Sequence, residues 1–474
     1  MGTGTWNEKD RKKLPGFYNR FKTKAEERLG SGIHGIVAMP VKSNWGPVKK
    51  IFSVKDLKEL KKLVGDNSNF TAYKLGRLTL LGNPKELLLY RLTDGTEKVA
   101  SLTLKNIEGN EFVTLETKYP TDRNFNITIK PNLIESDKKD FIFYEGTKAL
   151  FTINALYGTV EDIVEKINSN VENNYVIAKK ASTANENGVL ESIVNTPIIG
   201  GDNGITNITN QNYLEAMAEF EKYKIDGLCL DGITDSSLHN AVKEWAAKNK
   251  ELGINVIAYL GGAKEEKIEQ ANTRSKQFNY ENIVNIYGGG IYEGVKYTPA
   301  ETACYIAGLA TGQQLKESLC NQKTIFEDVE PKLSTKEIED ALASGTLVVS
   351  TDDNDVVVVD DVNTLKNYPD DKSDVFGSIR AVKFMNAVDT DTAIKRKDFI
   401  GKFSNDDTGR TLIICALKGY FETLAKENVI GKDFTVKVDK ELQATAKPDE
   451  FFWKWDAKYL DVIKKIYGTG YVRR

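Results

Sequence analysis

Histidine, cysteine and proline are scarce in this chain. Of its 474 residues, two are His, four are Cys and 11 are Pro. With only His34 and His239, the chain lacks the residues for a zinc site built on several histidines and for most catalytic triads. The cysteines form no C-x-x-C pair, and they stand at Cys229, Cys304, Cys320 and Cys415. We therefore expect reduced, buried thiols, as in a chain made in a cytosol, and no disulfide framework.

Long apolar runs are also missing. No stretch of about 18 apolar residues exists, so no helix is expected to cross a membrane. The first residues lack the basic and then apolar pattern of a secretory leader. Lys plus Arg is 65 and Asp plus Glu is 68, and this balance is not that of a nucleic-acid coat. Hydrophobic residues at 40% are enough for packed cores, so wholesale disorder is excluded.

The length favours about three domains, and changes of pattern along the chain place their limits. We expect a multidomain fold of mixed α/β and α+β class: an α/β core, an inserted β-rich domain and a C-terminal α/β domain, with extended arms at both ends. The expected limits are 1–22 for the N-terminal arm, 23–92 with 200–342 for the middle domain, 93–199 for the insertion, and 343–474 for the C-terminal domain, whose arm spans about 457–474.

Periodicity predicts the elements within these limits. Residues 33–39 are strand-like, 54–64 carry a helical apolar face, and 71–92 are expected to return to short strands. From about 205 to 290 helices alternate with strands, which predicts a mostly parallel sheet. The strands expected in the insertion are 98–105, 112–119, 125–130, 140–144 and 149–154, with one helix at 160–167.

The last third of the chain is predicted to open with a hairpin. Residues 346–350 and 356–359 flank an acidic loop, and helices follow near 375–389 and 408–428. Residues 434–438 and 457–472 are predicted to be extended or mixed. The loop Asp352-Asp353-Asn354-Asp355 is interpreted as a solvated turn, because a calcium loop needs Gly at its sixth position, where Val357 stands.

The most enzyme-like group of residues follows a predicted buried strand and enters a helix. Cys229, Asp231, Asp235 and His239 stand where ligands bind in open α/β sheets, and an Asp–His pair can act as acid and base. The structural interpretation is favoured. Asp235 suits a helix N-cap, Asp231 precedes a glycine in a turn, and His239 lies off the apolar face.

Other motifs predict no chemistry. Gly288-Gly289-Gly290 follows a strand, but Glu293 stands where a dinucleotide-binding pattern needs Gly. Residues 200–204 lack the Lys-Ser/Thr of a phosphate-binding loop, so both stretches are interpreted as tight connections. The basic residues between 9 and 24 suit a solvated or partner-facing arm. No catalytic residue, metal ligand or cofactor is predicted.

The two ends of the chain are its most unusual segments. Both can be extended; the C-terminal stretch, residues 459–472, is half apolar, and the N-terminal one has little to bury by itself. Free strands of this kind can complete sheets in neighbouring molecules, where backbone hydrogen bonds supply affinity and alternate side chains supply specificity. The candidate arm residues are Thr5, Trp6, Phe17, Tyr18, Ile463, Ile466, Tyr467, Tyr471 and Val472.

A series of motifs in fixed order resembles a known family over nearly the whole chain. The motifs are Gly4-Thr5-Trp6, residues 14–19 (Leu-Pro-Gly-Phe-Tyr-Asn), Trp45-Gly46-Pro47, residues 117–120 with 124–127, 303–308, 345–349 with 362–365, 399–402 and 405–410. Together they resemble contractile tail sheath proteins, closest to those of Bacillus and Clostridium phages and defective prophages.

The resemblance implies a structural subunit without enzymatic activity. Such subunits polymerise around a tail tube as stacked rings and contract to drive the tube through a target envelope. Implied partners are further copies of the chain, the tube protein, and baseplate and terminator proteins, with no nucleic acid and no membrane insertion. The location would be a virion tail or a phage-tail-like particle assembled in the bacterial cytoplasm.

The resemblance also implies that the C-terminal domain faces the tube and the inserted domain faces outward. Lys395, Arg396 and Lys397 are then candidates to meet an acidic tube, with a solvated helix end as the alternative. Two other functions stay open: an α/β enzyme using Asp231, Asp235 and His239, and another self-assembling shell subunit.

Overall fold

The structure is a computed structural model that describes residues 2–4, 16–18, 35–182, 184, 188–394 and 396–473. The chain divides into two compact units. The larger comprises residues 33–390 and 462–474, and the smaller comprises residues 1–32 and 391–461.

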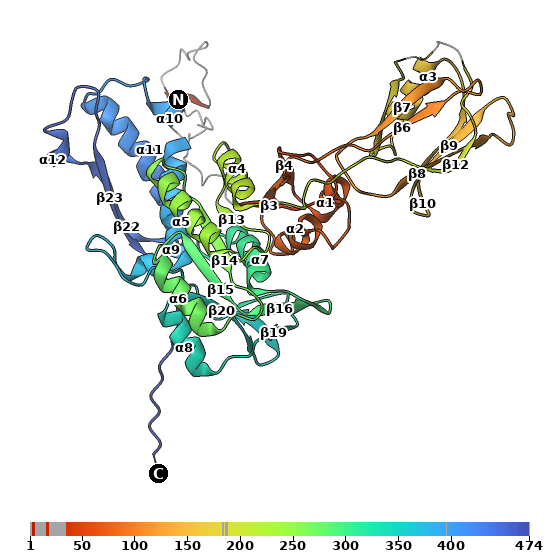
Figure 1. Ribbon diagram of the computed structural model, residues 1–474. Coiled ribbons are helices and arrows are strands. Elements are labelled where there is room, and N and C mark those ends of the chain that lie inside the picture. The colour runs from red at the N-terminus through yellow and green to blue at the C-terminus, as the bar shows by residue number, and fades with distance from the viewer. Residues whose placement is uncertain are drawn as a thin grey trace. The chain divides into compact units, whose positions relative to one another are not determined.

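A nine-stranded sheet forms the centre of the larger unit (Figure 1). Neighbouring strands from β20 to β5 run parallel, which confirms the predicted mostly parallel sheet. Antiparallel strands close both edges. In spatial order the strands are β18 (Gln322–Lys323), β21 (Asp355–Val358), β20 (Thr346–Asp352), β15 (Ile283–Tyr287), β14 (Ile257–Gly261), β13 (Gly227–Cys229), β3 (Ile36–Val41), β5 (Glu86–Arg91) and β4 (Ile51–Val54).

Helices cover both faces of this sheet, because alternate strand residues point to opposite sides. In β3, Val37 and Met39 join one apolar cluster, which includes residues of α1, α2 and α7. Ala38 joins the other cluster, with residues of α4 and α5. The helices are α1 (Leu57–Val64), α2 (Thr71–Leu81), α4 (Asn210–Phe220), α5 (Ser236–Glu251), α6 (Ile268–Phe278), α7 (Pro299–Gly312) and α8 (Thr335–Ala343).

One prediction in this region is wrong. Residues 71–81 were expected to be extended, but they form α2. Ala72, Leu75 and Leu78 are buried at helical spacing, and Gly76 brings the helix close to Leu60 of α1. Thr and Tyr, which favour strands, obscured this period, and packing against neighbouring helices overrode their local preference. Only residues 86–91 form the strand expected from that stretch.

The inserted region holds two small antiparallel sheets and one helix around its own apolar core. The five strands and the helix predicted between 98 and 167 are all present within a few residues. The elements are β6 (Ser101–Lys105), β7 (Glu111–Thr117), β8 (Phe125–Pro131), β9 (Lys139–Glu145), β10 (Lys148–Leu156), α3 (Val160–Ser169), β11 (Val176–Lys180) and β12 (Ile193–Pro197).

Further short elements complete the larger unit. The strands β17, β16 and β19 form a three-stranded sheet, and the predicted hairpin of β20 and β21 turns at Asp352–Asp355, with Asp353 at positive φ. A 3-10 turn, η1, leads to the long helix α9, whose last residues enter the smaller unit. The bounds are β16 (Gly289–Tyr292), β17 (Val295–Lys296), β19 (Asp328–Glu330), η1 (Asp374–Gly377) and α9 (Ile379–Ile394).

The smaller unit contains a long helix packed on a two-stranded antiparallel sheet. Phe421 of the helix contacts rings on both strands, Phe434 at 6.0 Å and Trp455 at 5.0 Å between centroids. Two N-terminal strands, β1 and β2, pair in parallel. The elements are β1 (Gly2–Gly4), β2 (Gly16–Tyr18), α10 (Arg396–Phe399), α11 (Asp407–Lys426), β22 (Ile430–Val438), α12 (Lys440–Gln443) and β23 (Trp453–Tyr459).

Candidate assembly surfaces and structural centres

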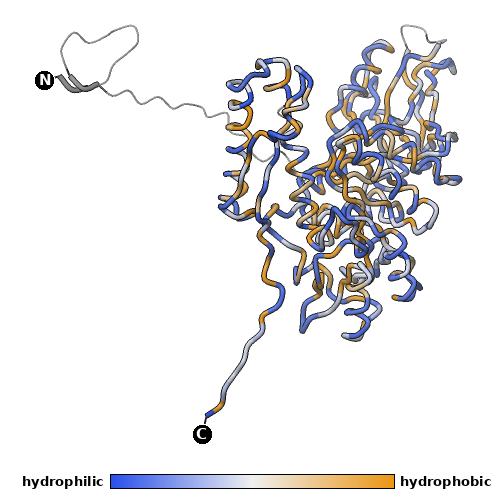
Figure 2. Tube along the Cα trace, turned by 90° about the vertical axis from the view of Figure 1, so that its left-hand side faces the viewer, coloured by the Kyte–Doolittle hydropathy of each residue, from blue (hydrophilic) through white to orange (hydrophobic). Residues whose placement is uncertain are grey.

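The C-terminal segment after β23 has no regular secondary structure and carries bare apolar side chains. Each of the five predicted C-terminal arm residues, from Ile463 to Val472, is at least 83% exposed. Figure 2 shows this segment running out into solvent with apolar residues along it. A soluble chain rarely leaves several large apolar side chains of one short segment in water without a partner.

The other predicted arm residues are only partly described. Phe17 and Tyr18 lie in β2, whose backbone pairs with β1 of the same chain. Thr5 and Trp6 lie outside the described residues. The first residues of the predicted C-terminal arm, 457–459, belong to β23.

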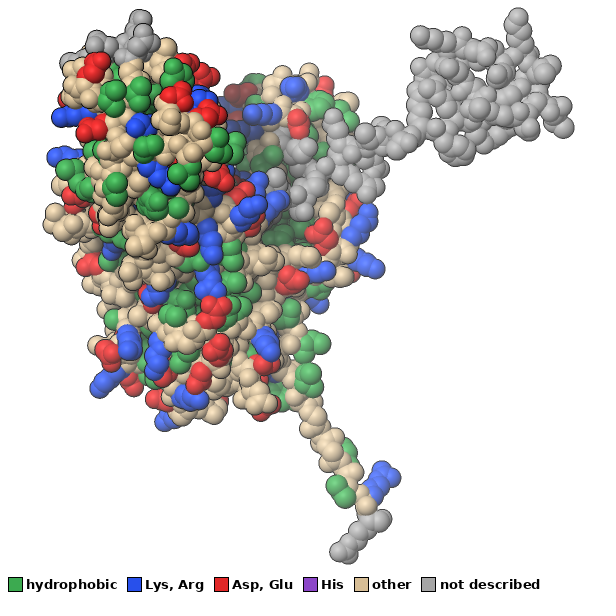
Figure 3. Space-filling view, turned by 90° about the vertical axis from the view of Figure 1, so that its right-hand side faces the viewer, with side chains coloured by type: hydrophobic (Ala, Val, Ile, Leu, Met, Phe, Trp, Pro, Cys, Tyr) green, Lys and Arg blue, Asp and Glu red, His purple; other side chains and the backbone are tan. Residues whose placement is uncertain are grey.

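The predicted tube-facing residues lie at a helix in the smaller unit. Arg396 and Lys397 are exposed in α10, and Lys395 lies outside the described residues. Figure 3 shows acidic and basic side chains interspersed over the visible face, without a broad field of one sign. A short cationic stretch of this kind suits a local contact better than long-range steering.

The sheet of β22 and β23 is open along β22. Within the described residues, β22 pairs with β23 along one edge and with no strand along the other. Helix α11 covers one face of this hairpin, which would be marginal without such packing. An edge with unpaired backbone groups is a template on which an extended segment of another chain can add.

Arg91 stands at the root of the insertion and joins it to the core. Its side chain is fully buried at the end of β5. It donates to the carbonyl oxygens of Gly46 at 2.9 Å, Pro120 at 2.9 Å and Asn203 at 3.1 Å. Burial lowers the pKa of Arg91 to about 10, so the guanidinium is still charged at neutral pH. One cation therefore ties a core loop to an internal loop of the insertion and to its C-terminal end.

Trp45 enters the apolar core of the insertion from the core domain. Its ring lies edge-on to Tyr119 at 5.2 Å and to Phe125 at 5.6 Å. The guanidinium of Arg123 lies 4.9 Å from the Trp45 ring and pairs with both oxygens of Glu145 at 2.7 Å. Trp45 and Arg91 thus form a junction that sequence patterns did not reveal, although an Arg in the apolar run of β5 was a signal.

The carboxylates of the enzyme-like group are occupied by structural contacts. Asp235 caps α5 by accepting from the Leu238 N–H at 2.8 Å, as predicted. Asp231 is buried and accepts from the Thr71 and Tyr213 hydroxyls, both at 2.6 Å. Burial raises the pKa of Asp231, and these bonds oppose the shift. Asp231 thereby fastens α2 and α4 to the end of β13.

The prediction that His239 lies off the apolar face is wrong, because its side chain is buried. Its Nε2 lies 3.1 Å from the Ile233 carbonyl oxygen, and burial lowers its pKa to about 4. The buried face of α5 is wider than the apolar spacing indicated, because it includes His239 and Asn249 beside Leu238 and Val242. Because His239 stays neutral and faces a backbone carbonyl, it does not form an acid–base pair with Asp235.

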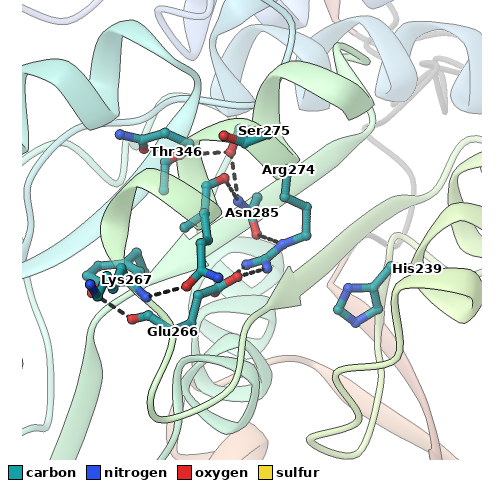
Figure 4. A network of polar contacts seen from close by, with 12 residues as sticks. His239, Glu266, Lys267, Arg274, Ser275, Asn285 and Thr346 are labelled. Carbon is teal, nitrogen blue, oxygen red and sulfur yellow. Dashed lines mark hydrogen bonds and ion pairs between the residues drawn. The ribbon is translucent and has the colours of Figure 1, made fainter.

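Arg274 is the cation whose charge lowers the pKa of His239, and its guanidinium is already paired. Figure 4 shows Arg274 in a network that continues to the strands, with His239 drawn apart from it. Arg274 donates to Glu266 and, at 3.0 Å, to the Asn285 side chain. Asn285 donates in turn to the Ser275 hydroxyl at 2.7 Å. This network joins α6 to β15.

The cysteines only partly match the prediction, and Gly288 lies in a tight connection as expected. Cys229 and Cys304 are buried and free, but Cys320 is half-buried and Cys415 is exposed, so the expectation of buried thiols holds for only two of them. Cys415 lies on the solvent side of α11, where an amphipathic helix presents polar and small residues. Gly288 has a positive φ and a tight surrounding, consistent with the connection expected there.

The described ranges contain neither a metal-binding cluster nor a membrane-spanning helix. In residues 35–182, 188–394 and 396–473, no cluster of His, Cys, Asp or Glu has the arrangement of a metal site. No helix in those ranges has the length and apolar content needed to span a bilayer.

Sequence comparisons match most of the chain to one family in three parts. Residues 93–203 match the phage tail sheath protein beta-sandwich domain, 206–364 the phage tail sheath protein central domain, and 371–473 the phage tail sheath C-terminal domain. The chain is similar to the uncharacterised protein YqbK of Bacillus subtilis, with 26% identity over 98% of this chain and 99% of that protein. It is also similar to the phage-like element PBSX protein XkdK of that organism, with 25% identity over 84% and 83% of the two chains.

Solved structures share the fold. The sheath tail protein from Desulfitobacterium hafniense has a TM-score of 0.71 and 23% identity, over 94% of this chain and 100% of that chain. The contracted helical sheath of the anti-feeding prophage has a TM-score of 0.55 and 10% identity, over 97% and 99%. The matched family consists of structural sheath proteins and not of enzymes. By its three matched domains, the chain belongs to the phage tail sheath protein family.

Proposed function

We propose that this sheath subunit polymerises around a tail tube through exchanged terminal arms and then contracts to drive the tube through a target envelope. The observation that carries the proposal is the C-terminal arm, here residues 463–473. Its five large apolar side chains are almost fully exposed, and they have no regular structure to hold them. Such a segment is useful only when a neighbour buries it.

The free edge of β22 supplies a place for an arm of a neighbouring copy. An arm strand added there would extend the hairpin of β22 and β23 to three strands. Each backbone hydrogen bond adds roughly 1 kcal/mol and each buried apolar side chain about 1.5–3 kcal/mol. Ordering each arm residue costs about 1–2 kcal/mol, so one contact is modest and stability comes from many linked copies.

The geometry of such an exchange favours a tube. The donor is an arm and the acceptor is a sheet edge, so the contact is heterologous and repeats from copy to copy. A heterologous contact that does not close into a ring generates a helical array. The arms can keep neighbours attached while the folded units repack, which is what a two-state contraction requires.

Further partners follow from this function. Arg396 and Lys397, with Lys395, are proposed to face an acidic surface on the tube protein. Baseplate and terminator proteins are proposed at the two ends of the sheath. The particle is a virion tail or a phage-tail-like particle assembled in the host cytoplasm.

Arm deletion tests the proposal most simply. A chain without residues 462–474 should keep the circular dichroism and melting of the full chain and should form no tubes in negative-stain electron microscopy. A variant with Leu133→Ser and Ile134→Ser, which removes two exposed apolar residues from a loop of the insertion, is the control and should still assemble. Tubes formed by the arm-deleted chain would contradict the arm exchange. Closed shells from the full chain would instead favour the alternative of another self-assembling shell subunit.

A further inference from the structure

An ion pair holds the root of the C-terminal arm on its own subunit. The Lys464 ammonium lies 2.7 Å from the Asp360 carboxylate, which follows β21 in the larger unit. The two side chains are only 23% and 27% exposed, so water screens this ion pair less than a typical surface pair. The chain rejoins the larger unit at Val462, and Lys464 follows within two residues.

A second carboxylate, that of Asp361, lies next to Asp360 in the sequence and is buried. It accepts from the Ser378 hydroxyl and the Arg380 N–H. Burial raises the pKa of Asp360, but the hydrogen bond and charge of Lys464 outweigh it and lower the pKa below its usual value. Burial also lowers the pKa of the nearby Lys366; the charge of Asp360 opposes this shift and the charge of Lys464 adds to it. Lys464 therefore pairs with Asp360 and lies near the buried Asp361, where its charge opposes the rise in pKa that burial causes.

The side chains directly after Lys464 are exposed. Lys465 is exposed and makes no ion pair within the described residues. The next large side chains, Ile466 and Tyr467, are each 88% exposed. Lys464, which forms an ion pair, is thus followed by Lys465, which forms none within the described residues, so Lys465 serves as a matched control.

We propose that the Lys464–Asp360 ion pair is a clasp that holds the arm root on its own subunit and directs residues 465–473 toward the neighbour. This inference rests on the proposed exchange of arms. A clasped arm leaves the subunit at a fixed point and in a fixed direction, so less freedom is lost when a neighbour binds it. Without the clasp, only part of the population holds the arm in a competent direction, and the apparent affinity falls by that fraction.

The size of the effect follows from the strength of such pairs. A partly exposed ion pair biases an equilibrium by about two- to five-fold. Loss of the clasp should therefore raise the protein concentration at which tubes appear by about two- to five-fold, without changing the fold. Lys464→Arg keeps the charge and should assemble like the unaltered chain, whereas Lys464→Gln and Asp360→Asn should both show the rise. Lys465→Gln should show none.

Two measurements on the full chain decide the matter. The first is backbone ¹⁵N relaxation of unassembled protein. In the unaltered chain and in Lys465→Gln, Ile463 and residue 464 should be more ordered than Tyr467 to Val472. In Lys464→Gln they should become as mobile as those residues. Equal mobility at position 464 in the unaltered chain and in Lys464→Gln would overturn the clasp itself.

The second measurement is the threshold concentration for tubes, from sedimentation checked by electron microscopy. A loosened arm root in Lys464→Gln with an unchanged threshold would overturn the claim that the clasp directs assembly. If the unaltered chain forms no tubes at all, the proposed function fails, but relaxation still decides whether the clasp exists. The two failures are thus distinguishable.

Discussion

Trp45→Ala tests the junction between the core and the insertion. The Trp45 side chain is 2% exposed and belongs to the apolar core of the inserted domain, although it lies outside that domain in sequence. Replacement of a buried Trp by Ala costs about 3–5 kcal/mol, because contacts are lost and a cavity remains. The Arg123 guanidinium, 4.9 Å from the ring, also loses the aromatic face over which it lies.

The loss of stability should lower the melting temperature of the insertion and leave the other thermal transitions of the chain unchanged. For a domain of roughly 100 residues, each kcal/mol shifts the melting temperature by about 4–8 °C, so the insertion should melt more than 10 °C lower. Scanning calorimetry measures this shift, and hydrogen exchange at Phe125 and Phe143 locates it in the insertion. Val194→Ala is the control, because Val194 is 78% exposed in the same domain and should cost less than about 0.5 kcal/mol. A Trp45→Ala chain whose insertion melts like that of the control would refute the junction.

Three further predictions concern single buried positions. Because the pKa of His239 is about 4 in the fold and about 6.5 unfolded, the unfolded chain binds more protons between these values. Stability should therefore fall by on the order of 3 kcal/mol as pH drops from 6.5 to 4, and urea unfolding of His239→Leu should lack this component. Gly308→Ala should destabilise, since a Cβ there would collide with the Thr79 backbone oxygen, whereas Gly419→Ala meets no atom within 4 Å and should be neutral or stabilising by about 0.5–1 kcal/mol in the same assay. Arg91→Met leaves three carbonyl oxygens, two of them buried, without their donor and should cost on the order of 3 kcal/mol in calorimetry; a loss under about 1 kcal/mol would show that water replaces the guanidinium.

Local patterns predicted the parts of the fold that local forces decide. The strands of the insertion alternate apolar and polar residues between turn signals, and they were found within a few residues. The helix–strand rhythm from 205 to 290 predicted the parallel sheet, because each buried strand there is a short apolar run. Residues 71–81 were missed because their strand-favouring residues conceal a helical period that only packing on neighbouring helices reveals.

The long-range contacts could not be predicted in the same way. Trp45 fills a core built by residues more than 50 positions away, and Arg91 meets acceptors from three loops. His239 is buried beside the Ile233 carbonyl, and the apolar spacing of α5 does not show this contact. The exposure of the C-terminal arm was predictable, because the segment is half apolar and its sequence offers no neighbouring segment to pack against.

The central claim is that the C-terminal arm is buried by a neighbouring copy. An electron cryo-microscopy structure of the assembled protein tests it directly at the position of Ile466 to Val472. The account predicts that this segment lies in an adjacent subunit, as an added strand beside β22. Density that places the segment on its own subunit, with β22 unpaired and neighbours joined through side chains alone, would contradict the account.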